Sequence, residues 1–223
     1  MRQLKLVRTD YIIVEALLSR SIDYYFTPQS PWTYLGHARF TAIVKAAGAT
    51  VRLRPCDFGA VFPVSGGLPL GKRAPQRQAY RLVDLARFSR HLGIPMIPKP
   101  KFFPVVGDDA AKLIIAVDLN DGTDAAMQLC GALFQAVWIQ DRNIADPKVL
   151  DAVVAECGLS PKRIDQSLSQ RVQELYEDYT QQAIDADVFG APSYVVDGEI
   201  FWGQDRLDFL ERALNQQPPT TGA

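Results

Sequence analysis

The feature that most constrains the fold is a strand, a helix and a second strand in direct succession near the start of the chain. Residues 22–26, "IDYYF", are rich in strand formers, and residues 31–47 place apolar side chains at helical spacing. After Gly48 the segment "TVRLRP" alternates apolar and basic residues. This order predicts two parallel strands joined by a right-handed crossover.

The C-terminal part predicts a different pairing of strands. The segments "SYVVD" and "EIFWG" flank Gly198, and Asp197-Gly198 is a strong signal for a tight turn between antiparallel strands. An amphipathic helix, "QDRLDFLERALN", follows. The predicted order is therefore βαβ, a long insertion, and ββα.

The insertion is predicted to be mainly helical. Residues 59–75 carry four glycines and three prolines, so we expect a surface loop there. Residues 94–104 are too rich in proline for regular structure. Apolar spacing and capping residues predict helices over residues 76–92, 108–120, 123–141, 146–158 and 160–188.

Charge and cysteine usage limit the partners. The chain has 24 basic and 25 acidic side chains, for a net charge of -1, so we expect neither nucleic acid nor an anionic membrane as a partner. Cys56, Cys130 and Cys157 are scattered, which argues against a disulfide framework or a metal site and suits a reducing cytoplasm. Asp10 and Glu15 interrupt the first apolar run, and no A-x-A cleavage pattern follows, so we reject a signal peptide.

The junction between the first strand and the first helix is the best candidate for chemistry. It reads "TPQSPWTYLG", and Ser30 can cap the helix while Pro31 suits its first position. A ligand-binding group would produce the same pattern, because a helix N-terminus beyond the carboxyl end of a strand favours anions. The junction alone leaves both interpretations open.

Two further positions could belong to the same cleft. Ala191-Pro192 directly precedes a strand, where a cis bond would bend the chain and leave the backbone of Ala191 free to pair with an extended peptide. Gln204-Asp205 opens the last helix, and Asp205 could be a plain cap or could bind a cationic group.

These motifs together resemble a known family. A helix-opening Ser-Pro-aromatic-Thr motif combined with "FGAPSYVVDGEIFWGQDRLDFLERAL" is similar to the 2-hydroxychromene-2-carboxylate isomerases, relatives of kappa-class glutathione transferases in the DsbA-like thioredoxin group. The resemblance spans residues 22–214 and includes "GGLPLGKRAPQRQAYRLVDLARF" and "KFFP". It implies an α/β chain with a thioredoxin-like fold (βαβ…ββα) and a large helical insertion domain.

The expected division of the chain follows from this fold. We expect a leader outside the fold at residues 1–20, a thioredoxin-like domain at 21–62 and 186–216, an inserted helical domain at 63–185, and a disordered tail at 217–223. The family also suggests a homodimer, and the cysteine usage predicts a cytoplasmic location.

The resemblance implies glutathione as cofactor. The segment Ser30-Pro31-Trp32-Thr33 stands where redox relatives carry Cys-Pro-x-Cys, so thiol–disulfide exchange through a protein cysteine is excluded there. By this resemblance, Ser30 would donate a hydrogen bond to the glutathione thiolate and be the catalytic residue. Thr33, one turn deeper, is not expected to be the main thiol partner.

The rest of the implied glutathione site lies near the C-terminus. Ala191, before a cis Pro192, would pair with the cysteinyl backbone, and Asp205 with Gln204 would hold the γ-glutamyl group. Relatives often carry an Asn in the loop that corresponds to residues 66–70, and "GGLPLG" lacks it. Lys101 could bind a substrate carboxylate, or it could be a lysine that caps a loop and has no role in binding.

The implied activity is isomerisation of a 2-hydroxychromene-2-carboxylate-like aromatic ring-opening product by reversible addition of the thiolate. Trp32, Tyr34 and Phe62 could form the aromatic wall of the substrate site, or pack in the core. A transferase or dehalogenase that consumes glutathione is the alternative. A glutathione-binding or chaperone-like protein without turnover is a third class. His37 and His91 receive no role.

Overall fold

The computed structural model describes residues 20–216 and contains one four-stranded sheet in the order β2-β1-β3-β4. β1 (Ser21–Phe26) pairs in parallel with β2 (Thr50–Pro55) and antiparallel with β3 (Ser193–Val196). β4 (Glu199–Trp202) pairs antiparallel with β3 and forms one edge. The predicted parallel pair and the predicted C-terminal hairpin are both confirmed.

The helices connect these strands in the predicted order. They are α2 (Pro31–Ala47), α3 (Phe58–Ser65), α4 (Pro75–Leu92), α5 (Asp108–Asp121), α6 (Thr123–Trp138), α7 (Pro147–Glu156), α8 (Lys162–Ser167), α9 (Gln170–Asp185) and α10 (Leu207–Asn215), with short 3₁₀ turns η1 (Leu70–Lys72) and η2 (Gln204–Arg206). None of the helices within residues 20–216 combines the length and apolar character needed to cross a membrane.

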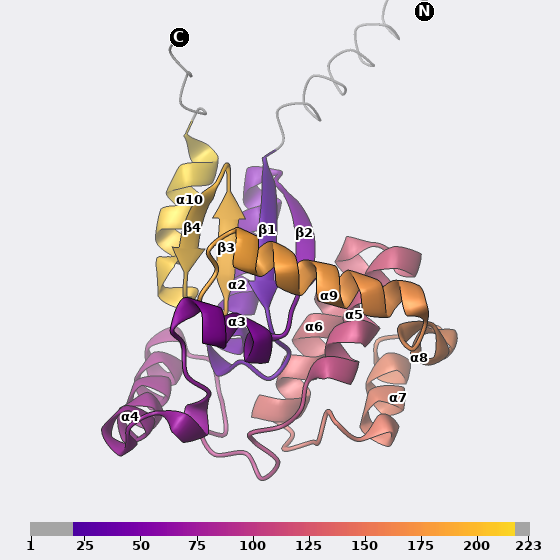
Figure 1. The fold of residues 1–223 in the computed structure, drawn as a ribbon, viewed down its shortest axis with the longest axis horizontal. Helices are drawn as coiled ribbons and strands as arrows, with labels where there is room; N and C mark the ends of the chain where they lie inside the picture. Colours follow the sequence, from indigo (N-terminus) through magenta and orange to yellow (C-terminus); the bar gives the residue numbers. More distant parts are fainter. Residues whose placement is uncertain (1–19, 217–223) are drawn as a thin grey trace, which may run out of the picture.

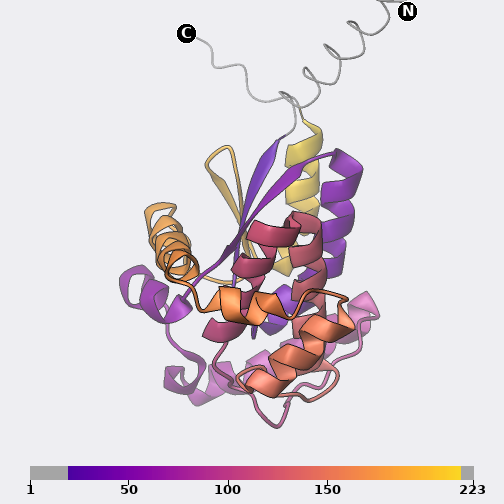
Figure 2. The same cartoon turned by 90° about the vertical axis from the view of Figure 1, so that its right-hand side faces the viewer.

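The sheet separates two hydrophobic cores. Figure 2 shows α9 on one side of the sheet and α2 with α10 on the other. The larger core combines alternate residues of β1, such as Ile22 and Tyr24, with α2, α5, α6 and α7. The smaller core contains Tyr25, Cys56 and the inner faces of α3 and α9. Each face of β1 therefore contributes to a different core.

The loop predicted over residues 59–75 is wrong in its first part, which forms α3. Asp57 caps this helix by accepting a hydrogen bond from the Gly59 amide at 2.6 Å. Val61 is fully buried, and α3 packs against α9. Burial and capping thus stabilise a short helix although Pro63 lies inside it.

The single helix predicted over residues 160–188 is also wrong, because two helices form there. α8 ends at Ser167, and Ser169 has extended backbone angles with its hydroxyl accepting from the Val172 amide at 3.4 Å. A serine cap therefore starts α9 separately. The predicted C-terminal helix begins with η2 before α10.

The expected domain boundaries remain predictions. The leader, apart from Arg20, and the tail at residues 217–223 lie outside the described residues. The boundary expected after residue 62 falls inside α3, and the expected insertion contains α4 to α9. In Figure 1 these inserted helices occupy the right side and lower left of the molecule beside the sheet.

A close contact joins α2 to η2. Gly36 is buried in the middle of α2, and a Cβ at this position would lie 2.8 Å from the Gln204 Cβ and 3.1 Å from the Tyr194 hydroxyl. Since neither atom is the free end of a flexible side chain, α2 or η2 would have to move to admit a larger residue.

We expect Gly36→Val to lower the free energy of unfolding by about 1–3 kcal/mol, because the added atoms overpack this contact. Chemical denaturation measures the change. Ala38→Val is the matched control on the exposed side of the same helix, where only helix propensity of roughly 0.5 kcal/mol changes. Equal losses in the two variants would contradict the packing argument.

Candidate active site

The predicted site segments meet at one end of the sheet. Ser30 follows the end of β1, and Pro192 directly precedes Ser193, which pairs with Tyr25 near that same end. The Gly203 amide, just before η2, donates a hydrogen bond to the Pro192 carbonyl at 2.8 Å. Figure 1 shows this end of the sheet directed toward α3 and α4.

Ser30 caps α2 as expected from its sequence context. Its side chain is 7% exposed, its backbone is extended, and its Oγ accepts from the Thr33 amide at 3.2 Å. Pro31 occupies the first helical turn. Accepting one bond uses a lone pair of the hydroxyl and leaves its hydrogen available to donate. Capping and ligand binding at Ser30 are therefore compatible.

The backbone near Ala191 has the predicted form. The Ala191-Pro192 bond is cis, which confirms the prediction from the sequence. Within residues 20–216, the amide and carbonyl of Ala191 make no hydrogen bond, and the residue is only partly buried. An extended peptide can therefore pair with this position. A second cis bond, Phe103-Pro104, was not predicted.

Gln204 and Asp205 lie in different environments although they are adjacent. Gln204 is 1% exposed, and its Oε1 and carbonyl accept weak hydrogen bonds from Arg39 at 3.4 Å. Its Nε2 has no partner within the described residues. Asp205 is exposed and pairs with Arg206 at 2.7 Å. Gln204 thus provides an unsatisfied buried donor that the sequence did not reveal.

The aromatic candidates for the substrate wall are partly buried. Trp32 lies edge-on to Phe88 of α4, with ring centroids 5.9 Å apart. The Tyr34 hydroxyl donates to the Pro95 carbonyl at 2.5 Å, which ties α2 to the segment after α4. These contacts give both side chains a structural role beside any contact with substrate.

Of the other two substrate candidates, one lies within α3 and one in a loop. Phe62, in α3, is partly buried and lies 5.6 Å from Phe58 between ring centroids. Lys101 is exposed, and its Nζ lies 5.2 Å from the ring centroid of Phe102. The roles of these candidates stay predictions.

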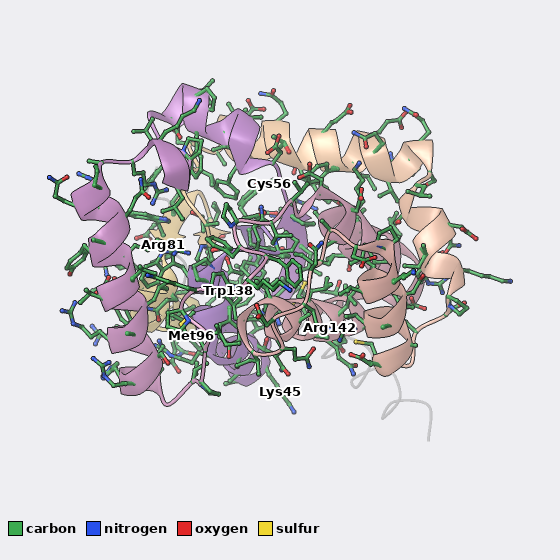
Figure 3. All side chains as sticks on the ribbon, turned by 90° about the horizontal axis from the view of Figure 1, so that it is seen from below. Lys45, Cys56, Arg81, Met96, Trp138 and Arg142 are labelled. Atoms are coloured by element: carbon green, nitrogen blue, oxygen red, sulfur yellow. The ribbon has the colours of Figure 1, made fainter. Side chains whose placement is uncertain are left out.

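One arginine that packs against aromatic rings was missed by sequence reasoning. Arg81, on α4, extends its guanidinium over Phe103 at 4.8 Å and toward Trp138 at 6.0 Å from the ring centroids. Nothing in the sequence distinguished it from the other arginines of this basic helix. Figure 3 shows Arg81 and Trp138 near each other between α4 and the central helices.

The cysteines are unsuited to thiolate chemistry. Cys56 and Cys130 are fully buried, and burial raises the pKa of both thiols. Cys157 is partly buried, and burial raises the pKa of its thiol too. Within residues 20–216, no three His, Cys, Asp or Glu side chains gather as a metal site requires.

Comparison with known proteins identifies the fold. A family model described as "DSBA-like thioredoxin domain" matches residues 21–215. A 2-hydroxychromene-2-carboxylate isomerase from Pseudomonas putida is 30% identical over 199 residues, which cover 87% of this chain and 94% of the relative. A glutathione S-transferase kappa 1 from Caenorhabditis elegans is 25% identical, with 89% and 92% of the two chains covered.

A solved structure of a 2-hydroxychromene-2-carboxylate isomerase is similar with a TM-score of 0.75 at 25% identity, covering 87% of this chain and 94% of that chain. The predicted thioredoxin-like fold with a helical insertion is confirmed by this likeness and by the family model.

His37 is a buried titratable group in α2, seven residues after Ser30. Its Nε2 donates to the Met127 carbonyl at 2.9 Å, which assigns the proton to that nitrogen, and its Nδ1 has no partner within the described residues. Burial lowers the pKa of His37 from 6.5 to about 4. The folded protein therefore holds this imidazole neutral at physiological pH.

We expect this burial to make stability depend on pH. Because the pKa is lower in the folded state than in the unfolded state, the unfolded state binds more protons between these values, from 6.5 down to about 4. Stability is then complete above pH 6.5 and is lost as the pH falls, by about 3 kcal/mol. Urea denaturation across this range measures the loss.

His37→Gln removes the titrating group and should flatten this part of the pH profile relative to the unsubstituted protein. His91→Gln is the control, because His91 is exposed at the end of α4. Parallel profiles for the unsubstituted protein and His37→Gln would rule out the assignment.

Proposed function

We propose a function that rests on the family and on the geometry of the site. The chain belongs to the 2-hydroxychromene-2-carboxylate isomerase family, among proteins that share the DSBA-like thioredoxin domain. The resemblance drawn from the sequence motifs is thereby confirmed. The proposed activity is glutathione-dependent cis–trans isomerisation of an aromatic ring-opening product that carries an unsaturated side chain and a carboxylate. The hydroxyl of Ser30 at the N-terminus of α2 is the observation that carries the proposal.

The residues at this end of the sheet fit glutathione. The unpaired backbone of Ala191 suits the cysteinyl unit, whose amide and carbonyl need partners. The unpartnered Nε2 of Gln204 is a donor for the γ-glutamyl carboxylate, and the exposed carboxylate of Asp205 suits its ammonium group. These three residues would hold the cofactor, and Ser30 would face its sulfur.

Glutathione, when bound, supplies a thiolate that adds reversibly to a conjugated double bond and so allows rotation about it. Ser30 keeps its hydroxyl hydrogen available to stabilise negative charge on sulfur, since its lone pair already accepts from Thr33. The N-terminus of α2 adds its partial positive charge. Together they would lower the pKa of the glutathione thiol from its usual value of about 8.5 toward neutrality, so that more of the thiol is ionised at neutral pH.

The neighbouring residues would exclude water and orient the substrate. Trp32 and Phe62 offer partly exposed aromatic surface for a planar substrate. The bond from Tyr34 to Pro95 fixes the segment after α4 beside α2. Dimer formation and a cytoplasmic location remain predictions.

A transferase that consumes glutathione is the alternative, supported by the relatives named glutathione S-transferase kappa. Both activities need the same activated sulfur. Incubation with glutathione and a panel of aromatic ring-opening products separates them: an isomerase keeps the free thiol concentration constant during turnover. Steady loss of thiol with turnover would favour the transferase, and isomerisation that persists after removal of glutathione would exclude the cofactor.

We expect Ser30→Ala to reduce glutathione-dependent turnover by about 10²–10³-fold, because it removes a donor aimed at developing charge. Loss of the cap should lower the free energy of unfolding by only about 1 kcal/mol. Steady-state kinetics and denaturation measure the two effects.

Ser169→Ala is the matched control, because Ser169 caps α9 in the same way through the Val172 amide. This variant should lose similar stability and keep its turnover. If both variants lose activity equally, or if Ser30→Ala keeps full turnover, Ser30 has no direct role in the reaction.

A further inference from the structure

Two hydrogen-bond donors without acceptors lie together beside α4. The Nη2 of Arg81 and the Nε1 of Trp138 are both buried and have no partner within the described residues. The Arg81 guanidinium carbon lies 6.0 Å from the Trp138 ring centroid. Buried donors without acceptors are unfavourable, and most are paired in folded proteins. Two such donors in neighbouring side chains mark this part of the molecule as one where polar groups lack partners.

The surrounding charge indicates that a partner for Arg81 would be an anion. Arg81 is not part of any hydrogen bond or ion pair between side chains in residues 20–216, and Arg73 is close enough to oppose its charge. The pKa of Arg81 is lowered to about 10, mainly by burial and in second place by the positive charge of Arg73. Its guanidinium is therefore still charged at neutral pH. Within the described residues, the guanidinium of Arg73 donates only to the Leu68 carbonyl, at 2.7 Å, and its central carbon lies 6.0 Å from the ring centroid of Phe62. Neither cation has an acidic partner in the described chain.

The aromatic rings around Arg81 suit an aromatic anion. The guanidinium lies 4.8 Å from the ring centroid of Phe103, and Phe103 lies 4.9 Å from Trp138. Cation–π contact explains why the arginine is held here, but it leaves the hydrogen-bonding edge of the guanidinium unsatisfied. Arg81 as a whole is only partly buried, although its Nη2 is covered by neighbouring atoms.

The position of Arg81 relates it to the Ser30 end of the sheet. Arg81, Leu85 and Phe88 lie at i, i+4 and i+7 on one face of α4, and Phe88 contacts Trp32 beside Ser30. Seven residues span about 10 Å along a helix. An arginine side chain and an aromatic acid can bridge that separation, so a carboxylate at Arg81 is compatible with a double bond near Ser30.

We propose that Arg81, with the charge of Arg73 and against the rings of Phe103 and Trp138, binds the carboxylate of the aromatic substrate. This inference rests on the proposed function and names the residue that binds the carboxylate which that function gives to the substrate. It assigns carboxylate binding to Arg81 instead of the exposed Lys101. The glycyl carboxylate of glutathione has the same chemistry, so the experiment must separate the two sources.

The test uses 2-hydroxycinnamate and its amide as probes without glutathione, so that binding is measured apart from turnover. The unsubstituted protein should bind the acid at least tenfold more tightly than the amide in calorimetric titration. Arg81→Met keeps the length of the side chain and should abolish that preference. Arg77→Met, on the exposed surface of the same helix, should retain it.

The free energy of unfolding separates a binding role of Arg81 from a purely structural one, because the loss of a structural arginine would lower it. Removing an unpaired buried cation relieves its desolvation, so Arg81→Met should keep or raise the free energy of unfolding while losing the acid preference. Arg81→Lys, which keeps the charge without the planar fork, should raise KM for the carboxylate substrate more than it lowers kcat. A destabilised Arg81→Met with unchanged KM in Arg81→Lys would overturn the proposal.

S-Methylglutathione separates the two sources of carboxylate. Weaker binding of S-methylglutathione to Arg81→Met, with the acid preference unchanged, would overturn the substrate assignment. If the unsubstituted protein shows the acid preference but no glutathione-dependent isomerisation, the proposed function fails and the Arg81 site stands. If it isomerises and Arg81→Met binds both probes as before, the Arg81 site fails alone.

Discussion

The hydrogen bonds along both edges of β1 connect the two halves of the chain. On one edge β1 pairs in parallel with β2, and on the other it pairs antiparallel with β3, which comes more than a hundred residues later. The Cys56 amide extends the first ladder by donating to the Phe26 carbonyl at 3.0 Å. Because β1 is central, the residue that follows it and the residues that precede β3 are held at one end of the sheet. The candidate active site depends on this pairing.

Features set by neighbouring residues could be predicted from the sequence. Asp197 and Gly198 both have positive φ, 52° and 84°, as the tight-turn motif requires, and they form the turn of the hairpin between β3 and β4. Asp146 caps α7 through the Lys148 amide, and Ser30 caps α2. A cap or turn involves residues within about four positions of one another, so the local sequence contains most of the interactions that determine it.

Features set by distant contacts could not be predicted in the same way. Helix α3 forms against α9 despite Pro63, which by itself argued for a loop. Gln204 is buried because Gly36 of α2 leaves room for it. Arg81 is distinguished only by Phe103 and Trp138, which come from other parts of the chain. Sequence spacing could predict where Ser30 lies, but not which arginine of α4 packs against these rings.

The buried cysteines bear on a reaction that would use the sulfur of glutathione, as proposed, instead of a protein thiol. Cys56 and Cys130 are inaccessible, and burial keeps their thiols protonated at neutral pH. These two thiols therefore resist forming mixed disulfides when the glutathione pool is oxidised, whereas Cys157 is only partly buried. If glutathione supplies the sulfur as proposed, with serine at the start of α2 the reaction would use no protein disulfide, and its rate would follow the concentration of reduced glutathione by mass action.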